Sequence, residues 1–295
     1  MSTDTQRLGA PAKLNLHLGV HAELDERRYH RVDSLMVSLD LADYVSVTST
    51  HDAGGSITVG CTPAIDIPQE KNTCYRAGKL LAELFSTDAS TLIEIEKHIP
   101  DQAGLGGSSS DAAATIKALA TIWNIDADDP RLFQAARQTG ADVPFFLDGA
   151  PAFLVGAGDI FKERFDRPKQ PIPVALMRPE GPGVSTPAAY AAFDQEHEDP
   201  KDPEPLCALL RSGNWDGKDI ATLLVNNLEP IAMRLHPGIR DMRLWLAEQD
   251  GVLGCQVTGS GSCMFAICSD EEACEQIVCH SREKFKSWAK TAHIV

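Results

Sequence analysis

A glycine- and serine-rich stretch, Asp101–Ala112, holds the residues of this sequence best suited to chemistry. Its glycines let a backbone approach an anion closely, and the start of a following helix offers unpaired N–H donors and a positive dipole. The hydroxyls of Ser108, Ser109 and Ser110 can bond a phosphate or a magnesium ion. We interpret the stretch as a phosphate cradle; the alternative is a plain turn before a helix.

The spacing of the glycines disfavours two common nucleotide loops. No lysine follows them, as a Walker P-loop requires. Ser109 stands where the third glycine of a dinucleotide-binding Gly-x-Gly-x-x-Gly would be. A second loop of similar but weaker character, Thr258–Ser262, is expected between two strands, 254–257 and 263–268. The sequence therefore predicts an anion site of a less common kind.

Two polar residues, Lys13 and Asn15, lie on a strand predicted over 11–20. Leucines at 14, 16 and 18 alternate with them, so we expect one buried face and one polar face. Residues two apart on a strand point the same way, roughly 7 Å apart. Lys13 is thus either a solvated charge or, paired with Asn15, part of the site.

Tyr29 and His30 follow on a charged loop over 21–33. They suit either stacking on a flat ligand or covering the edge of the core.

The elements around these residues follow from periodicity and caps. We expect strands over 34–40 and 44–50 with a turn at Ala42-Asp43, a helix capped by Asn72, and a strand over 91–97 that feeds the glycine-rich stretch. A helix is predicted over 112–123, with Ser109 or Ser110 at its start. Asp142 lies between a helix ending at Gly140 and an expected aromatic-rich strand.

The order of strands and helices expected in the second half of the chain predicts a βαβ-type α+β domain. Prolines at 168, 171 and 173 mark a boundary, so we expect an N-terminal domain over 1–165 and a C-terminal domain over 166–295. A single helix is expected over 231–249 and another over 271–287, followed by a strand to the end of the chain.

The composition limits the partners. A net charge of −15 argues against nucleic acid or an anionic membrane as a partner. Neither a signal peptide nor an apolar run long enough for a membrane span is present, which predicts a cytoplasmic protein. The 8 cysteines form no Cys-x-x-Cys pair and no zinc spacing, so reduced thiols are expected.

Three stretches together resemble the motifs of the GHMP small-molecule kinases: Pro11–Leu16, Gly104–Ala113 and Thr258–Cys263. Tyr29-His30, Gly140–Phe146 and Asn227–Pro230 are further similar to the branch of that family that acts on cytidine-diphosphate methylerythritol in the non-mevalonate isoprenoid route. The resemblance spans residues 11 to about 268. It implies an α+β fold of two domains, the first like domain 2 of ribosomal protein S5 and the second ferredoxin-like.

The resemblance also implies roles for individual residues. Asp142 matches the general base for the acceptor hydroxyl, and Lys13 matches the lysine that orients this base and offsets charge on the moving phosphoryl group. Asn15 matches a contact to the methylerythritol unit, and Tyr29 and His30 match residues that hold the cytosine. The implied cofactors are ATP and Mg²⁺, with Ser110 as the magnesium contact. The positions that match the ATP site are Gly104, Leu105, Gly106, Gly107, Ser108, Ser109, Ser110, Asn72, Thr73 and Lys97.

The chain departs from the family pattern in two places, which leaves alternatives open. Ser108 stands where the family usually has glycine, and Arg27-Arg28 replaces Asp-Gly before Tyr29. These differences bear on the substrate more than on kinase chemistry. The alternative hypotheses are a related kinase of a mevalonate- or homoserine-like alcohol and a catalytically silent ligand sensor. A monomer and a homodimer are both compatible with the sequence.

Overall fold

The computed structural model describes residues 3–295, and the side chains of all of these except 51–53. The chain forms two compact units, neither of which is one continuous segment. The first unit contains residues 1–12, 41–100 and 106–149, and the second contains residues 13–40, 101–105 and 150–295. Two long strands, β1 (Thr3–Leu24) and β2 (His30–Ala53), contribute to both units.

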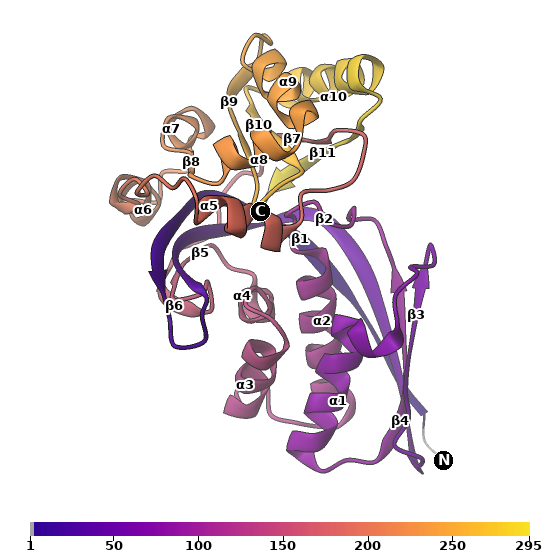
Figure 1. The fold of residues 1–295 in the computed structure, drawn as a ribbon. Coiled ribbons are helices and arrows are strands. Elements are labelled where there is room, and N and C mark those ends of the chain that lie inside the picture. The colour runs from indigo at the N-terminus through magenta and orange to yellow at the C-terminus, as the bar shows by residue number, and fades with distance from the viewer. Residues whose placement is uncertain (1–2) are drawn as a thin grey trace. The chain divides into compact units, whose positions relative to one another are not determined.

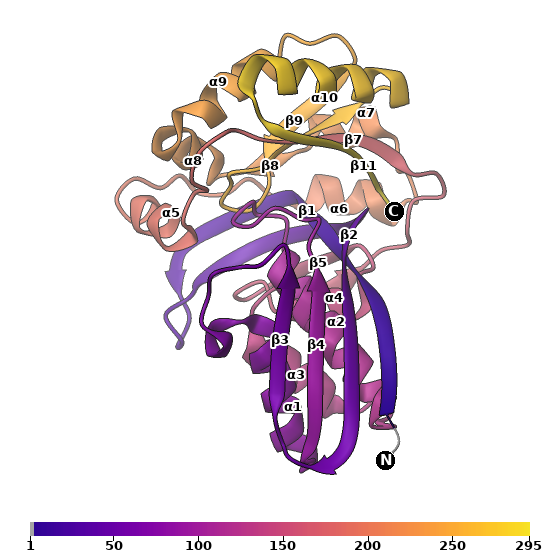
Figure 2. The ribbon, with the colours of Figure 1, turned by 90° about the vertical axis from the view of Figure 1, so that its right-hand side faces the viewer.

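The first unit is a sheet covered on one face by helices. Its remaining elements are β3 (Ile57–Thr62), a 3₁₀ turn (Gln69–Lys71), α1 (Thr73–Phe85), β4 (Ala89–Glu96), α2 (Gly107–Ile122), α3 (Pro130–Thr139) and α4 (Val143–Asp148). β4 pairs antiparallel with the second half of β2 and parallel with β3. Figure 1 shows α1, α2 and α3 together on one side of these strands, and in the turned view of Figure 2 they lie behind the strands.

The core of the first unit lies between that sheet and its helices. Apolar residues alternate along the strands, so Val45 and Val47 of β2 and Ile93 of β4 are fully buried. Leu81 of α1 and Ile116 of α2 are fully buried as well. The cap that was predicted at Asn72 is confirmed, since its side chain accepts a hydrogen bond from the backbone of Cys74. The predicted turn at Ala42-Asp43 is wrong, because β2 runs straight through it.

The second unit is an antiparallel sheet with helices packed on it. Its remaining elements are β5 (Ala152–Val155), β6 (Ile160–Arg164), β7 (Ile172–Arg178), α5 (Thr186–Phe193), α6 (Glu204–Arg211), α7 (Gly217–Thr222), β8 (Val225–Asn226), α8 (Glu229–Leu235), α9 (Pro237–Leu246), β9 (Val252–Val257), β10 (Met264–Cys268), α10 (Glu271–Phe285) and β11 (Trp288–Ile294). β7 lies between β11 and β10, and β9 pairs with the far side of β10.

A large apolar core joins this sheet to α5, α8, α9 and α10. Met177 and Met264 from the strands pack with Phe193, Met242 and Ile277 from the helices. α9 contacts β9 and β10, and α10 contacts β7 and β11 (Figure 1). The single helix predicted over 231–249 is instead two helices, because Pro237 cannot donate the backbone hydrogen bond that would continue the first.

All eight cysteines are free thiols, and six of them are buried. None of the helices within residues 3–295 has the length and apolar character that spanning a membrane requires.

Candidate active site

The glycine-rich stretch enters a helix earlier than predicted. α2 begins at Gly107 rather than at 112, with Gly106 as its N-cap in the left-handed region at φ 74°. The backbone amides of Ser109 and Ser110 donate to the carbonyl of Gly106 at 3.1 and 2.9 Å. The serines therefore form the first turn of a helix rather than a loop before it. A helix start with glycines and no bulky side chain is an anion-binding arrangement.

Ser110 has a hydroxyl that is available to a ligand. Its side chain is 1% exposed, and Oγ has no hydrogen-bond partner among the described residues. The neighbouring Asp111 is 3% exposed and leaves Oδ1 without a partner as well. Buried polar atoms normally have partners, so two adjacent exceptions at a helix start indicate a place for a bound group. The Ser110 hydroxyl would fit a phosphate oxygen or a cation, whereas the free carboxylate oxygen of Asp111 would fit a cation or a hydrogen-bond donor.

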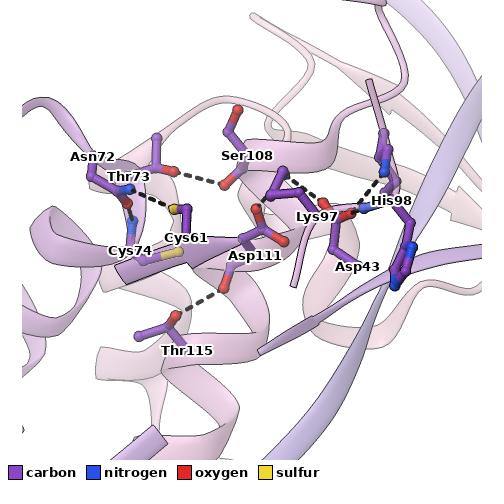
Figure 3. Close-up of polar contacts among 11 residues, drawn as sticks. Asp43, Cys61, Asn72, Thr73, Cys74, Lys97, His98, Ser108, Asp111 and Thr115 are labelled. Atoms are coloured by element: carbon purple, nitrogen blue, oxygen red, sulfur yellow. Dashed lines mark hydrogen bonds and ion pairs between the residues drawn. The ribbon is translucent and has the colours of Figure 1, made fainter. Parts of the chain in front are cut away.

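A hydrogen bond joins the start of α1 to the start of α2. Thr73 Oγ1 donates to the backbone carbonyl of Ser108 at 2.8 Å, and the Asn72 amide lies 3.9 Å from the sulfur of Cys61 (Figure 3). The predicted nucleotide residues Asn72, Thr73 and Ser108 are thus brought together inside the first unit. The Asn72 cap fixes where α1 begins, and so fixes where the Thr73 hydroxyl lies.

Lys97 lies in a buried ionic cluster with two aspartates. Its Nζ donates to Asp43 at 2.5 Å and to Asp111 at 2.8 Å, and the three side chains are 8%, 0% and 4% exposed (Figure 3). Burial alone would lower the pKa of Lys97, but the carboxylates of Asp111 and Asp43 raise it above its ordinary value. Burial raises the pKa of Asp111 to about 7, against the opposing attraction of Lys97.

Sequence reasoning missed Asp43, which was placed in a turn. The alternation of β2 carries a signal, because Asp43 shares its face with the buried residues Leu41, Val45 and Val47. A carboxylate at an inward position of a strand needs a buried partner. Asp43 finds that partner in Lys97, and it also accepts the backbone amides of His98 and Ile99 at 2.5 and 2.7 Å.

In the second unit, Lys13 and Asn15 do point the same way along β1. Lys13 Nζ donates to Asn15 Oδ1, as the alternation predicted. The expected contrast of a buried face and a polar face is wrong, because Lys13 is 3% and Asn15 1% exposed. The polar face is covered as well, and the side chains of Lys13 and Asn15 on it find neighbours to bond. The Asn15 amide donates to Ser34 at 2.9 Å, and its oxygen accepts the backbone amide of Gly259 at 3.1 Å.

The second glycine loop contacts the first part of the glycine-rich stretch. The backbone amide of Cys263 donates to the carbonyl of Ala103 at 3.1 Å, and Lys13 donates its own backbone amide to the carbonyl of Leu105 at 2.9 Å. A Cβ at Gly104 would lie 2.1 Å from the carbonyl oxygen of Thr258, and Gly104 has φ +75°. Only glycine fits there, so the two glycine motifs are built to approach each other.

Tyr29 and His30 have different environments. Tyr29 is 57% exposed at the turn between β1 and β2, whereas His30 is 8% exposed. The His30 ring packs at 5.3 Å from Tyr190 and 5.5 Å from Phe193, and Nε2 lies 3.2 Å from a carboxylate oxygen of Asp194. The sequence did not identify Tyr190, Phe193 or Asp194 as partners of His30. Tyr190 and Phe193 stand one helical turn apart, which is the only local signal.

The structure explains part of the difference between Arg27-Arg28 and the Asp-Gly that the family usually has before this tyrosine. Arg27 pairs with the buried Asp159 at 3.0 Å and with Asp25 at 2.9 Å, and its guanidinium lies 5.4 Å from the centre of the Tyr29 ring. The hydrogen bonds that Arg27 donates to Asp159 and Asp25 hold its pKa above its ordinary value. Arg28 adopts φ 65°, a region that favours glycine, so the turn keeps a glycine-type backbone without the glycine.

Asp142 immediately precedes a helix rather than the predicted aromatic-rich strand. α4 runs from Val143 to Asp148, with Pro144 in its first turn, where proline is well tolerated, and Gly149 as its left-handed C-cap. Phe145 and Phe146 of this helix are buried, so the apolar run that resembled a strand belongs to a buried helix. Asp142 belongs to the first unit and Lys13 to the second, so their pairing stays a prediction.

The part of the chain that the structure describes holds no dedicated metal cage. Between residues 3 and 295, no three His, Cys, Asp or Glu side chains gather in a way that could hold a metal ion. Magnesium in phosphoryl-transfer enzymes is held mainly by the nucleotide phosphates with one or two protein oxygens. The free hydroxyl of Ser110 suits that smaller role.

Comparison with known proteins places the chain in a family. The model for the N-terminal domain of GHMP kinases matches residues 72–150, and the model for their C-terminal domain matches residues 190–287. Relatives called 4-diphosphocytidyl-2-C-methyl-D-erythritol kinase occur in Pelotomaculum thermopropionicum, 35% identical over 92% of both chains, and in Desulfitobacterium hafniense, 36% identical over 93% of this chain and 91% of the relative.

Solved structures agree with this relationship. A crystal structure of 4-(cytidine 5'-diphospho)-2C-methyl-D-erythritol kinase has a TM-score of 0.77 at 31% identity, over 98% of this chain and 99% of the other. A homoserine kinase from Cytophaga hutchinsonii shares the fold, with a TM-score of 0.70 at 20% identity over 99% and 95% of the two chains. The predicted α+β fold is confirmed, and the chain belongs to the GHMP kinase family of small-molecule kinases.

Proposed function

We propose that this kinase transfers the γ-phosphoryl group of ATP to the 2-hydroxyl of 4-diphosphocytidyl-2-C-methyl-D-erythritol, a step in the non-mevalonate formation of isoprenoid precursors. Relatives named for this kinase activity match more than nine-tenths of the chain. The observation that carries the substrate choice is the His30 cluster. An exposed tyrosine beside a histidine packed on Tyr190 and Phe193 is suited to a flat, hydrogen-bonding base such as cytosine.

The proposed chemistry uses Asp142 and Lys13. Asp142 accepts the proton of the attacking hydroxyl, and Lys13 orients Asp142 and offsets the negative charge on the phosphoryl group in transit. The Asn15 oxygen accepts a hydrogen bond from Lys13, which limits where the ammonium can lie. Asn15 remains a proposed contact to the methylerythritol unit. Its observed hydrogen bonds add a second task, which is to hold Lys13.

ATP is proposed to bind at the start of α2. The backbone from Gly104 to Ser110 would receive the phosphates, and Asn72 and Thr73 would lie beside the adenine nucleoside. Mg²⁺ would accompany the phosphates and neutralise part of their charge, with the hydroxyl of Ser110 as a protein ligand. The free Oγ of that residue supports this role.

Activity on a panel of acceptors tests the substrate. Purified protein is given ATP, Mg²⁺ and one of three acceptors: the cytidine diphosphate substrate, mevalonate or homoserine. We expect ADP formation with the first alone, and a raised KM for it when Tyr29 and His30 are both replaced by alanine. Faster turnover of mevalonate or homoserine would overturn the substrate assignment, and ADP formation with none of them would overturn the proposed activity.

The roles of the two catalytic residues are tested by substitution. Asp142→Asn should lower kcat by about 10²- to 10⁴-fold, because the proton acceptor is lost. Lys13→Ala should also lower kcat strongly. Asp148→Asn is the matched control, since Asp148 is exposed at the other end of the same helix and should retain normal kcat. An Asp142→Asn enzyme with full activity would disprove the general-base role.

A further inference from the structure

The ionic cluster of Lys97 joins the chain just before the glycine-rich stretch to Asp111, near the C-terminal end of that stretch. Lys97 directly follows β4, and Asp111 lies in α2 just beyond the serines of the first turn. The ion pair at 2.8 Å between them closes the intervening loop. Fixing the two ends of a loop reduces the conformations open to it, so the helix start is held in place before any ligand binds.

Asp43 holds the same region from the strand side. One of its oxygens accepts from the Lys97 ammonium, and the other accepts from the backbone amides of His98 and Ile99 (Figure 3). The carboxylate therefore fixes both the side chain and the backbone where the chain leaves β4. A buried carboxylate with three charge-assisted or backbone hydrogen bonds is a rigid anchor.

The same contacts oppose a direct role of the Lys97 charge in binding phosphate. An ammonium has three donors, and two of them are already directed at buried carboxylates. Drawing Lys97 toward a phosphate would leave Asp43 or Asp111 buried beside another carboxylate without its counter-charge, which is costly. By contrast, the free hydroxyl of Ser110 can meet a ligand with no such rearrangement.

We infer that Asp43, Lys97 and Asp111 act together as positioning residues for the ATP site. They hold the first turn of α2 so that its backbone amides and Ser110 meet the phosphates, and the Lys97 ammonium itself is not a phosphate ligand. This inference rests on the proposed binding of ATP at the start of α2.

The two roles of Lys97 predict opposite results for the neighbouring aspartates. If Lys97 positions the loop, Asp43→Asn and Asp111→Asn each break an ion pair and weaken ATP binding. If Lys97 binds phosphate directly, either substitution removes a competing carboxylate and leaves binding unchanged or tighter. Asparagine keeps the size of the side chain and an oxygen for the backbone amides, so the change is confined to charge.

The experiment measures binding of an ATP analogue with a β,γ-imido bridge, with Mg²⁺, by calorimetry and without the acceptor. We expect each single variant to bind about tenfold more weakly, equivalent to about 1.4 kcal/mol. The double variant should bind little worse than the weaker single variant, because both substitutions disable one cluster. In turnover, KM for ATP should rise while KM for the acceptor alcohol stays the same.

Asp129→Asn is the matched control. Asp129 is the N-cap of α3 in the first unit and pairs with Arg131 at 2.6 Å rather than with the Lys97 cluster, so it reports the effect of losing one negative charge. Its binding of the analogue should equal that of the unaltered protein. Thermal unfolding identifies any variant that does not fold. If Asp43→Asn does not fold, Asp111→Asn alone still separates the two roles of Lys97: weaker binding of the analogue supports positioning, and unchanged or tighter binding supports direct phosphate contact.

Unchanged or tighter binding in the folded Asp111→Asn variant would overturn the inference while leaving the kinase activity intact. Absence of analogue binding by the unaltered protein would instead overturn the proposed ATP site. The two failures are therefore distinguishable.

Discussion

The buried polar network around Lys97 in the first unit is ionic, whereas the one around Asn15 in the second unit is built mainly from neutral groups. Around Lys97, two carboxylates share one ammonium. Around Asn15, an amide, the Ser34 hydroxyl and the backbone of Gly259 exchange ordinary hydrogen bonds, with the Lys13 ammonium as the charged member. An ionic network is sensitive to the loss of any one charge, because the others stay buried. A neutral network loses less when one hydrogen bond is removed.

The largest expected effect comes from removing the shared cation. Lys97→Met leaves Asp43 and Asp111 facing each other without a counter-charge, and should lower the free energy of unfolding by about 3–5 kcal/mol. Urea unfolding followed by circular dichroism measures it. Lys117→Met is the control: this α2 lysine donates to the neutral carbonyl of Phe146 at 3.2 Å. Equal losses in the two variants would contradict the special status of the ionic network.

A smaller effect is expected in the neutral network. Ser34→Ala leaves the buried amide of Asn15 without its acceptor, and should lower the free energy of unfolding by about 1–2 kcal/mol. The same urea titration measures it. Because the Asn15 amide then has freedom to rotate away from Lys13, kcat should fall as well. A loss as large as that of Lys97→Met would show that the two networks do not differ as proposed.

The smallest effect is expected where a similar ionic arrangement lies near the surface. His293 contacts Asp40 at 2.6 Å and Glu271 at 2.7 Å. Burial lowers the pKa of His293, but the two carboxylates outweigh it and raise the pKa above 6.5. The stabilisation is therefore fully present below about pH 6.5 and is lost as the pH rises through the raised pKa.

Comparing His293→Gln with the unaltered protein isolates this contribution. The difference in unfolding free energy should be under about 1 kcal/mol at pH 5.5 and should vanish by alkaline pH. A difference that grows with pH would contradict the assigned direction.

Motifs and caps made most of the fold predictable. The glycines of the two loops, the alternation of β1 and the Asn72 cap depend on local backbone chemistry, which a sequence shows directly. The α4 error has a physical cause: Val143-Pro144-Phe145-Phe146 is a short apolar run, and such a run does not distinguish a buried strand from a buried helix.

The partners of the site residues could not be predicted in the same way. Asp43 is far from Lys97 in sequence, and Ser34 is far from Gly259, so only the folded chain brings them together. The burial of Lys13 and Asn15 was missed for the same reason, since an alternating strand does not reveal that both of its faces are covered. Long-range contacts between polar groups leave no period in a sequence.

The interleaved course of the chain limits how this protein can be divided. Residues 13–40 and 101–105 belong to the second unit although they are synthesised before or within the first. A gene fragment that encodes only the second half would lack those strands and the Ala103–Leu105 segment against which Cys263 and Lys13 are bonded. Neither unit can therefore be exchanged between relatives by a single crossover, and during translation the second unit cannot be completed before β11 has been made.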